Sequence, residues 1–149
     1  MMINNLFNST LENELKVLLV MEWNPKKKYS NNKLLALDFI ICYAGVFGFE
    51  VDNLNGNKRY MFGEISSRRL ALNEAIKELV VQGLVDVTID KGYEYSISQE
   101  GLKYIEKMKS EYSLNYRKIT SLVLAEYCDY GERELMNLIQ DKAINSIRR

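Results

Sequence analysis

The sequence predicts a mainly helical protein with one small β-hairpin. Three observations support this prediction. Apolar residues recur at helical spacing through most of the 149 residues, one short stretch alternates between apolar and polar side chains, and proline occurs only at Pro25. With 47% hydrophobic and 27% charged residues, the chain has enough apolar material to bury a core of its own. We therefore expect a single domain over residues 1–149.

The composition narrows the possible functions. The chain contains no histidine, which argues against Ser-His-Asp or Cys-His catalysis and against nearly all zinc sites. Its 20 Lys and Arg balance 20 Asp and Glu, so any contact with nucleic acid needs a local basic patch. No glycine-rich Walker-type loop is present. These features favour a binding or scaffold protein, and we expect no catalytic residue, cofactor or metal.

The cysteines predict a reducing environment. Cys42 and Cys128 lie 86 positions apart, each within an apolar helical pattern. The sequence shows neither a signal peptide nor an apolar run long enough to cross a membrane. We expect two reduced core cysteines in a cytoplasmic protein that does not contact a membrane.

The first third of the chain predicts two helices. Ser9 and Glu12 form a capping box for the first, which Pro25 ends. Ser30 and the two residues after it offer caps for a second helix from about Lys33 to Tyr43. That helix is apolar on nearly all sides, so we expect it to be buried.

A helix, a hairpin and another helix come next. After a glycine-rich excursion over 45–63, the first of these helices starts near Ser66, and Gly83 suits a left-handed cap at its end. Residues 84–98 alternate about the turn at 90–92, which predicts two antiparallel strands. The second helix opens at Ser98, and its expected inner face holds Leu102, Ile105, Met108 and Tyr112. This order is the pattern of a winged helix whose wing covers about 84–98.

Two further helices are predicted over 115–127 and 132–148, within a C-terminal extension covering about 114–149. Their apolar residues exceed what a minimal winged helix needs, so they either extend its core or present a partner surface. We expect the last helix to carry the partner surface because the rest of the fold can already close a core. The candidate partner-binding residues are Leu135, Leu138, Ile139, Lys142, Arg148 and Arg149.

A basic patch is the candidate contact for DNA or a partner. Its residues are Lys58, Arg59, Arg68 and Arg69. They lie before and at the start of the helix that a winged helix offers to a major groove. The outer face of the same helix carries Glu74 and Glu78, and carboxylates there repel phosphates. We therefore expect at most weak, non-specific contact with DNA.

Several runs ahead of the hairpin resemble a known family. They are Leu37-Asp38-Phe39-Ile40, Phe47-Gly48, Asn53-Leu54-Asn55-Gly56, Phe62-Gly63-Glu64 and Arg68-Arg69. With them, nearly the whole chain resembles the middle component of bacterial ABC-ATPase three-component conflict systems, which overlap Lamassu-type antiphage defence. The resemblance implies a small non-catalytic adaptor that links an SMC-like or Rad50-like ABC ATPase to an effector, often a nuclease, in a response to invading DNA.

Within this pattern, Asp38, Asn55 and Glu64 are candidate interface or structural polar residues. Asp38 lies in an apolar helix, so it needs a cationic or hydrogen-bonding partner if it is buried. Arg68 and Arg69 are candidates for that partner. The alternative function is a winged-helix transcriptional regulator, a dimer with both arginines on operator phosphates.

Overall fold

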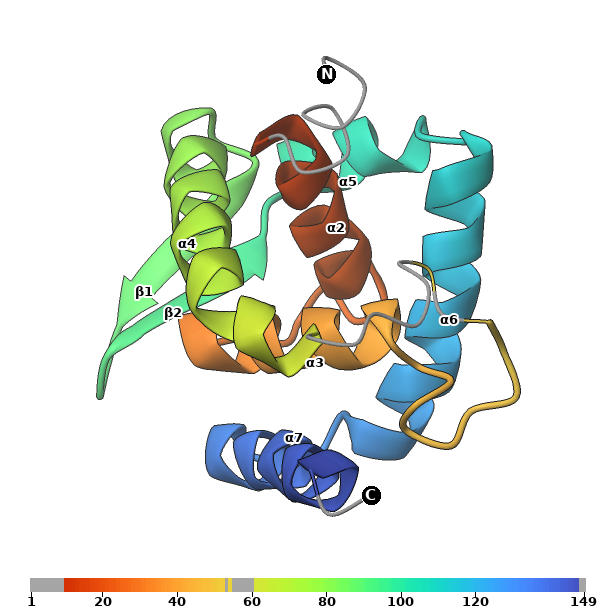
Figure 1. Ribbon diagram of the computed structural model, residues 1–149. Coiled ribbons are helices and arrows are strands. Elements are labelled where there is room, and N and C mark those ends of the chain that lie inside the picture. Colours follow the sequence, from red (N-terminus) through yellow and green to blue (C-terminus); the bar gives the residue numbers. More distant parts are fainter. Residues whose placement is uncertain (1–9, 53, 55–60, 148–149) are drawn as a thin grey trace.

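The structure is a computed structural model that describes residues 10–52, 54 and 61–147. Its elements, in chain order, are α2 (Thr10–Glu22), α3 (Asn31–Cys42), the 3-10 helix η1 (Met61–Glu64), α4 (Ile65–Val81), β1 (Val85–Ile89), β2 (Tyr93–Ile97), α5 (Gln99–Glu106), α6 (Glu111–Tyr127) and α7 (Glu132–Ile147). The predicted mainly helical architecture with a two-stranded hairpin is confirmed (Figure 1).

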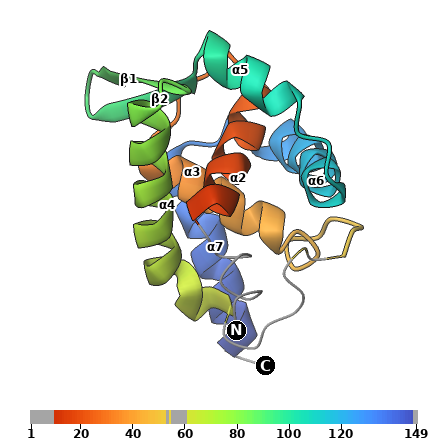
Figure 2. The ribbon, with the colours of Figure 1, turned by 90° about the horizontal axis from the view of Figure 1, so that it is seen from above.

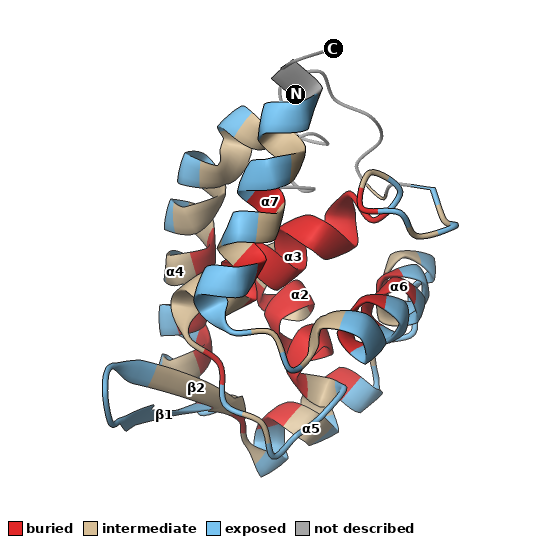
Figure 3. Cartoon of the chain, turned by 90° about the horizontal axis from the view of Figure 1, so that it is seen from below, coloured by how far each residue is buried: buried red, intermediate tan, exposed pale blue. Residues whose placement is uncertain are grey.

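Helix α3 lies at the centre of the molecule. Helices α2, α4, α6 and α7 all pack against it, and every residue from Leu34 to Cys42 is buried. Figure 3 shows the resulting contrast, with α3 buried along its length and α4, α6 and α7 exposing their outer sides. The predicted burial of an all-round apolar helix is confirmed.

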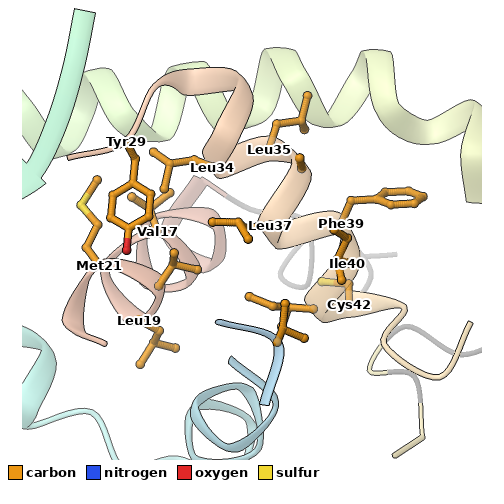
Figure 4. Close-up of a cluster of buried hydrophobic side chains, with 14 of the residues drawn as sticks. Val17, Leu19, Met21, Tyr29, Leu34, Leu35, Leu37, Phe39, Ile40 and Cys42 are labelled. Carbon is orange, nitrogen blue, oxygen red and sulfur yellow. The ribbon is translucent and has the colours of Figure 1, made fainter. Parts of the chain in front are cut away.

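The core forms mainly between α2 and α3. Figure 4 shows apolar side chains of both helices gathered in one cluster, together with the ring of Tyr29 from the loop that joins them. Tyr29 is 1% exposed, and Leu18, Leu37 and Ile41 are fully buried. Burial of each such aliphatic side chain contributes on the order of 1.5–3 kcal/mol.

Local sequence signals fix several helix ends. The side chains of Ser30, Ser98 and Ser110 accept hydrogen bonds from the first turns of α3, α5 and α6. At the end of α4, Gly83 has φ of 76°, and the Leu84 amide donates to the Leu79 carbonyl at 3.0 Å. This is the left-handed cap predicted at Gly83.

The hairpin is rooted in the core at its base. Its register pairs Val85 with Ile97 and Val87 with Tyr95, and Val85 and Ile97 are both buried. On its inner edge, Tyr29 and Tyr95 exchange two backbone hydrogen bonds of 2.8 and 2.9 Å. The hairpin is therefore tied to the α2–α3 loop as well as to α4.

The boundary between α5 and α6 differs from the prediction. We expected one helix to run on to Tyr112, but α5 ends at Glu106 and Tyr112 belongs to α6. Ser110 starts α6 by accepting a hydrogen bond from Ser113, and the Arg117 guanidinium donates to the Ile105 carbonyl at 2.6 Å. A cation at the carbonyl end stabilises the early end of α5.

Candidate functional site

Asp38 on α3 is the centre of a buried polar cluster. It is 4% exposed, and Arg68 of α4 places Nη1 3.0 Å from Oδ2. The Tyr116 hydroxyl of α6 donates to the other carboxylate oxygen at 2.7 Å. The sequence predicts a cationic or hydrogen-bonding partner for this carboxylate, with Arg68 and Arg69 as candidates. In the structure the arginine partner is Arg68.

Glu64 extends this cluster toward the surface. Its carboxylate lies 3.7 Å from Arg68 Nε and accepts a hydrogen bond of 2.9 Å from the Tyr43 hydroxyl. The Arg68 guanidinium also lies 5.6 Å from the centre of the Tyr43 ring, within cation–π range. Arg68 therefore forms ion pairs with both Asp38 and Glu64.

Lys16 of α2 is a member of the cluster that the sequence analysis missed. It is 3% exposed, and its ammonium lies 3.7 Å from Glu12. Burial favours the neutral amine, but Asp38, with smaller contributions from Cys42 and Tyr112, holds the pKa of Lys16 above its ordinary value. Its burial could have been predicted, because it is the one charged residue in the otherwise apolar run from Leu15 to Met21.

The charges of the cluster stabilise one another. Burial by itself would raise the pKa of Asp38, but Lys16, Arg68 and the Tyr116 hydrogen bond together lower it below its ordinary value. Burial lowers the pKa of Arg68, but Asp38, Cys42 and Tyr43 together raise it above its ordinary value. We call Lys16, Asp38, Glu64, Arg68 and Tyr116 the Asp38 cluster. It connects α2, α3, α4 and α6.

A pocket of about 340 Å³ opens beside the Asp38 cluster. Its lining residues are Asn13, Lys16, Asp38, Glu64, Ser67, Arg68, Ala71 and Leu72. The charged groups of this wall already pair with one another, so their first effect is to hold the helices in place. Burial also raises the pKa of the neighbouring Cys42 thiol to about 12, which keeps it protonated near neutral pH.

The two cysteines differ from each other. Both are free thiols, and Cys42 is fully buried as expected of a core cysteine. Cys128, at the end of α6, is only half-buried, and its carbonyl accepts a hydrogen bond from the Lys33 ammonium. Cys42 therefore lies in the core as expected, whereas Cys128 packs against the edge of the core.

Two residues of the predicted basic patch, Arg68 and Arg69, lie within the described part of the chain, and both pair with side chains of α3. Arg68 turns inward to Asp38, with only 14% of its side chain exposed, which favours a structural role for it over a contact with DNA or a partner. Arg69 also turns toward α3, where its guanidinium donates to Asn32. Lys58, Arg59 and Asn55 lie outside the described residues.

The exposed side chains of α4 and of both faces of the hairpin are acidic on balance and partly apolar. Its charged side chains are Glu74, Lys77, Glu78, Asp86, Asp90, Lys91 and Glu94. This set contains five carboxylates and two lysines, so its net charge is negative. Apolar side chains are also exposed there, with Leu70 at 71%, Val81 at 80%, Ile89 at 73% and Tyr93 at 61%. We call this the α4–hairpin surface.

Helix α7 packs on α3, and two of the six residues predicted to bind a partner are buried at this contact. Leu135 is fully buried and Ile139 is 3% exposed, because the all-round apolar α3 needs cover on this side as well. Leu138 and Lys142 are half-buried. Arg148 and Arg149 lie outside the described residues.

The described ranges contain neither a cluster of metal ligands nor a membrane-spanning helix. In residues 10–52, 54 and 61–147, no three Cys, Asp or Glu side chains gather as ligands for a metal ion. Over the same part of the chain, no helix combines the length and the apolar character that crossing a bilayer requires.

Comparison with known proteins identifies a family over almost the entire length. Residues 6–149 match the family model described as ABC-three component (ABC-3C) system Middle Component 2. No curated protein and no solved structure matches the chain. The resemblance to a middle component is therefore confirmed, whereas the Lamassu type stays a prediction.

Proposed function

The chain belongs to the ABC-three component (ABC-3C) system Middle Component 2 family, and we propose that it acts there as a non-catalytic adaptor. In this proposal it links an SMC-like or Rad50-like ABC ATPase component to an effector component such as a nuclease. The complex acts in the cytoplasm against phage or plasmid DNA. Membership of a system with several components supports the existence of partner subunits.

The arrangement of elements supports a winged-helix domain as the adaptor's scaffold. Helices α2, α3 and α4 stand for its three helices, and β1 and β2 for its wing. Such a domain places a short additional strand beside its wing. Tyr29 occupies this position, because it forms an antiparallel bridge with Tyr95. Helices α6 and α7 then complete a single domain by covering α3.

The α4–hairpin surface is the observation that carries the adaptor proposal. In a winged helix that reads DNA, this surface presents basic residues to phosphates. Here it presents five carboxylates, two lysines and several exposed apolar side chains. Negative charge repels a phosphate backbone, whereas exposed apolar area is what a protein partner covers.

The test is reconstitution from the three components of one system. The ATPase and the effector are expressed with and without this chain, and one of them carries an affinity tag. We expect the untagged component to co-purify only when this chain is present. Equal recovery without this chain, or no binding of this chain to either component, would overturn the proposal.

A further inference from the structure

The outer edge of β1 is an open hydrogen-bonding edge. In Figures 2 and 3, β1 is the outer strand of the hairpin, and β2 lies between it and the rest of the molecule. The inner edge of β2 is occupied, because Tyr95 exchanges its backbone hydrogen bonds with Tyr29. The outer edge has no such cover among the described residues.

The register shows which backbone groups point outward. Since the amide and carbonyl of Tyr95 face Tyr29, its partner Val87 forms a non-hydrogen-bonded pair with it. The amide and carbonyl of Val87 therefore point away from β2, and those of Ile89 do the same two residues later. The ladder instead uses the backbone groups of Asp86 and Thr88, which pair with Ser96 and Glu94.

The two faces of this edge differ in chemistry. One face carries Val87, Ile89 and Tyr93, which are 41%, 73% and 61% exposed and continue the buried root of the hairpin outward. The opposite face carries Asp86, Thr88 and Glu94. With four β-branched residues in five, β1 also favours an extended conformation.

We propose that the β1 edge takes up an extended segment of a partner component as an added strand. The segment alternates apolar residues, which lie beside Val87 and Ile89, with lysine or arginine residues beside Asp86. Main-chain hydrogen bonds provide the affinity in such strand addition, and the alternating side chains provide the specificity. Cross-strand pairs of opposite charge and of apolar side chains stabilise the added strand. This inference rests on the proposed adaptor function and specifies one of its contacts.

Two variants test the edge against a matched control. Val87→Pro removes an outward amide without removing a ladder hydrogen bond, and Ile89→Lys places a cation where the segment is apolar. Leu114→Lys makes the same change at a side chain of α6 that is 52% exposed. The purified ATPase and effector components of the same system, each immobilised separately, are the probes. We expect both edge variants to weaken binding to one of them at least about tenfold, and the control to bind as the wild type does.

Amide hydrogen exchange of the wild-type chain provides a readout that does not depend on any variant. Upon complex formation, the Val87 and Ile89 amides should gain protection, whereas Asp86 and Thr88 are already bonded in the free protein. Unchanged exchange at Val87 and Ile89 in a complex that forms normally would overturn the edge proposal and leave the adaptor function standing. Failure of the wild-type chain to bind either component would overturn the adaptor function itself.

Discussion

At the scale of single residues, the buried Asp38 carboxylate of α3 interacts with charged or hydrogen-bonding groups of α2, α4 and α6. Removing its charge leaves Lys16 and Arg68 buried without their shared counter-ion. We expect Asp38→Asn to lower the free energy of unfolding by about 3–5 kcal/mol at pH 7. Urea denaturation followed by circular dichroism measures this change. A loss below about 1 kcal/mol would show that the cluster is dispensable.

The contribution of Asp38 depends on pH in a defined direction. Its pKa in the folded protein lies below the ordinary value of 3.8, so the carboxylate is bound more tightly to its cations when the chain is folded. The resulting stability is fully present above about pH 4 and is lost as the pH falls through the folded pKa. The difference between wild type and Asp38→Asn should therefore be equal at pH 7 and pH 5 and shrink at pH 3.

Gly101 is the residue where α5, the helix after the hairpin, approaches the turn between α4 and β1. A Cβ atom there would lie 2.1 Å from the Leu84 carbonyl oxygen, so the two backbones must separate to admit it. We expect Gly101→Ala to cost about 1–3 kcal/mol, measured as a shift in the urea midpoint. Gly63→Ala is the control, because nothing lies within 4 Å of the added atom. Equal stability of the two variants would contradict the close approach.

At the scale of elements, α7 is part of the core. Leu135 is fully buried at the contact with α3, so Leu135→Ala should cost about 2–5 kcal/mol through lost burial and the remaining cavity. Ile144→Ala on the same helix is the control, since that side chain is 43% exposed and should change stability by less than about 0.5 kcal/mol. Thermal melts of both variants measure this. An unchanged melting temperature for Leu135→Ala would show that α7 does not stabilise the core, and would favour α7 as a partner-binding helix.

The elements that the sequence predicted well are those with a local signal. Strict alternation marks β1 and β2, and Gly83 marks the end of α4 by a conformation that glycine adopts without strain. The break between α5 and α6 has a weaker signal, because apolar spacing continues from Met108 to Tyr112 and only Ser110 indicates a new helix. The packing of α7 on α3 joins segments that are distant in the sequence, so no local pattern indicates it. The apolar residues on all sides of α3 nevertheless imply that another element must bury each side.

The candidate site was predicted only in part for the same reason. A charged residue in an apolar helix signals a buried ion pair, which led to Asp38 and its arginine partner. Lys16 and Tyr116 come from helices distant in the sequence, and nothing local indicates that they meet the same carboxylate. The inward turn of Arg68 and Arg69 likewise follows from packing of α4 on α3.

At the scale of the whole molecule, balanced charge and an acidic α4–hairpin surface determine how the protein meets DNA. With no net charge, the isolated chain should bind duplex DNA no more tightly than roughly 1–100 μM at physiological salt. A mobility-shift titration with several unrelated duplexes measures this. A nanomolar, sequence-selective complex would contradict the adaptor proposal and favour the transcriptional regulator.

The unequal burial of the two thiols gives the natural sequence a built-in attachment point for a dye. A maleimide reacts with a thiolate that it can reach, and Cys42 is both fully buried and held protonated by a pKa of about 12. Cys128 is only half-buried, at the point where α6 meets the turn into α7. Mass spectrometry should therefore find one label on the native chain and two after denaturation. Two labels on the native chain would show that α3 opens on the timescale of the reaction. A single fluorophore at Cys128 would report movement between α6 and α7 without any engineered cysteine.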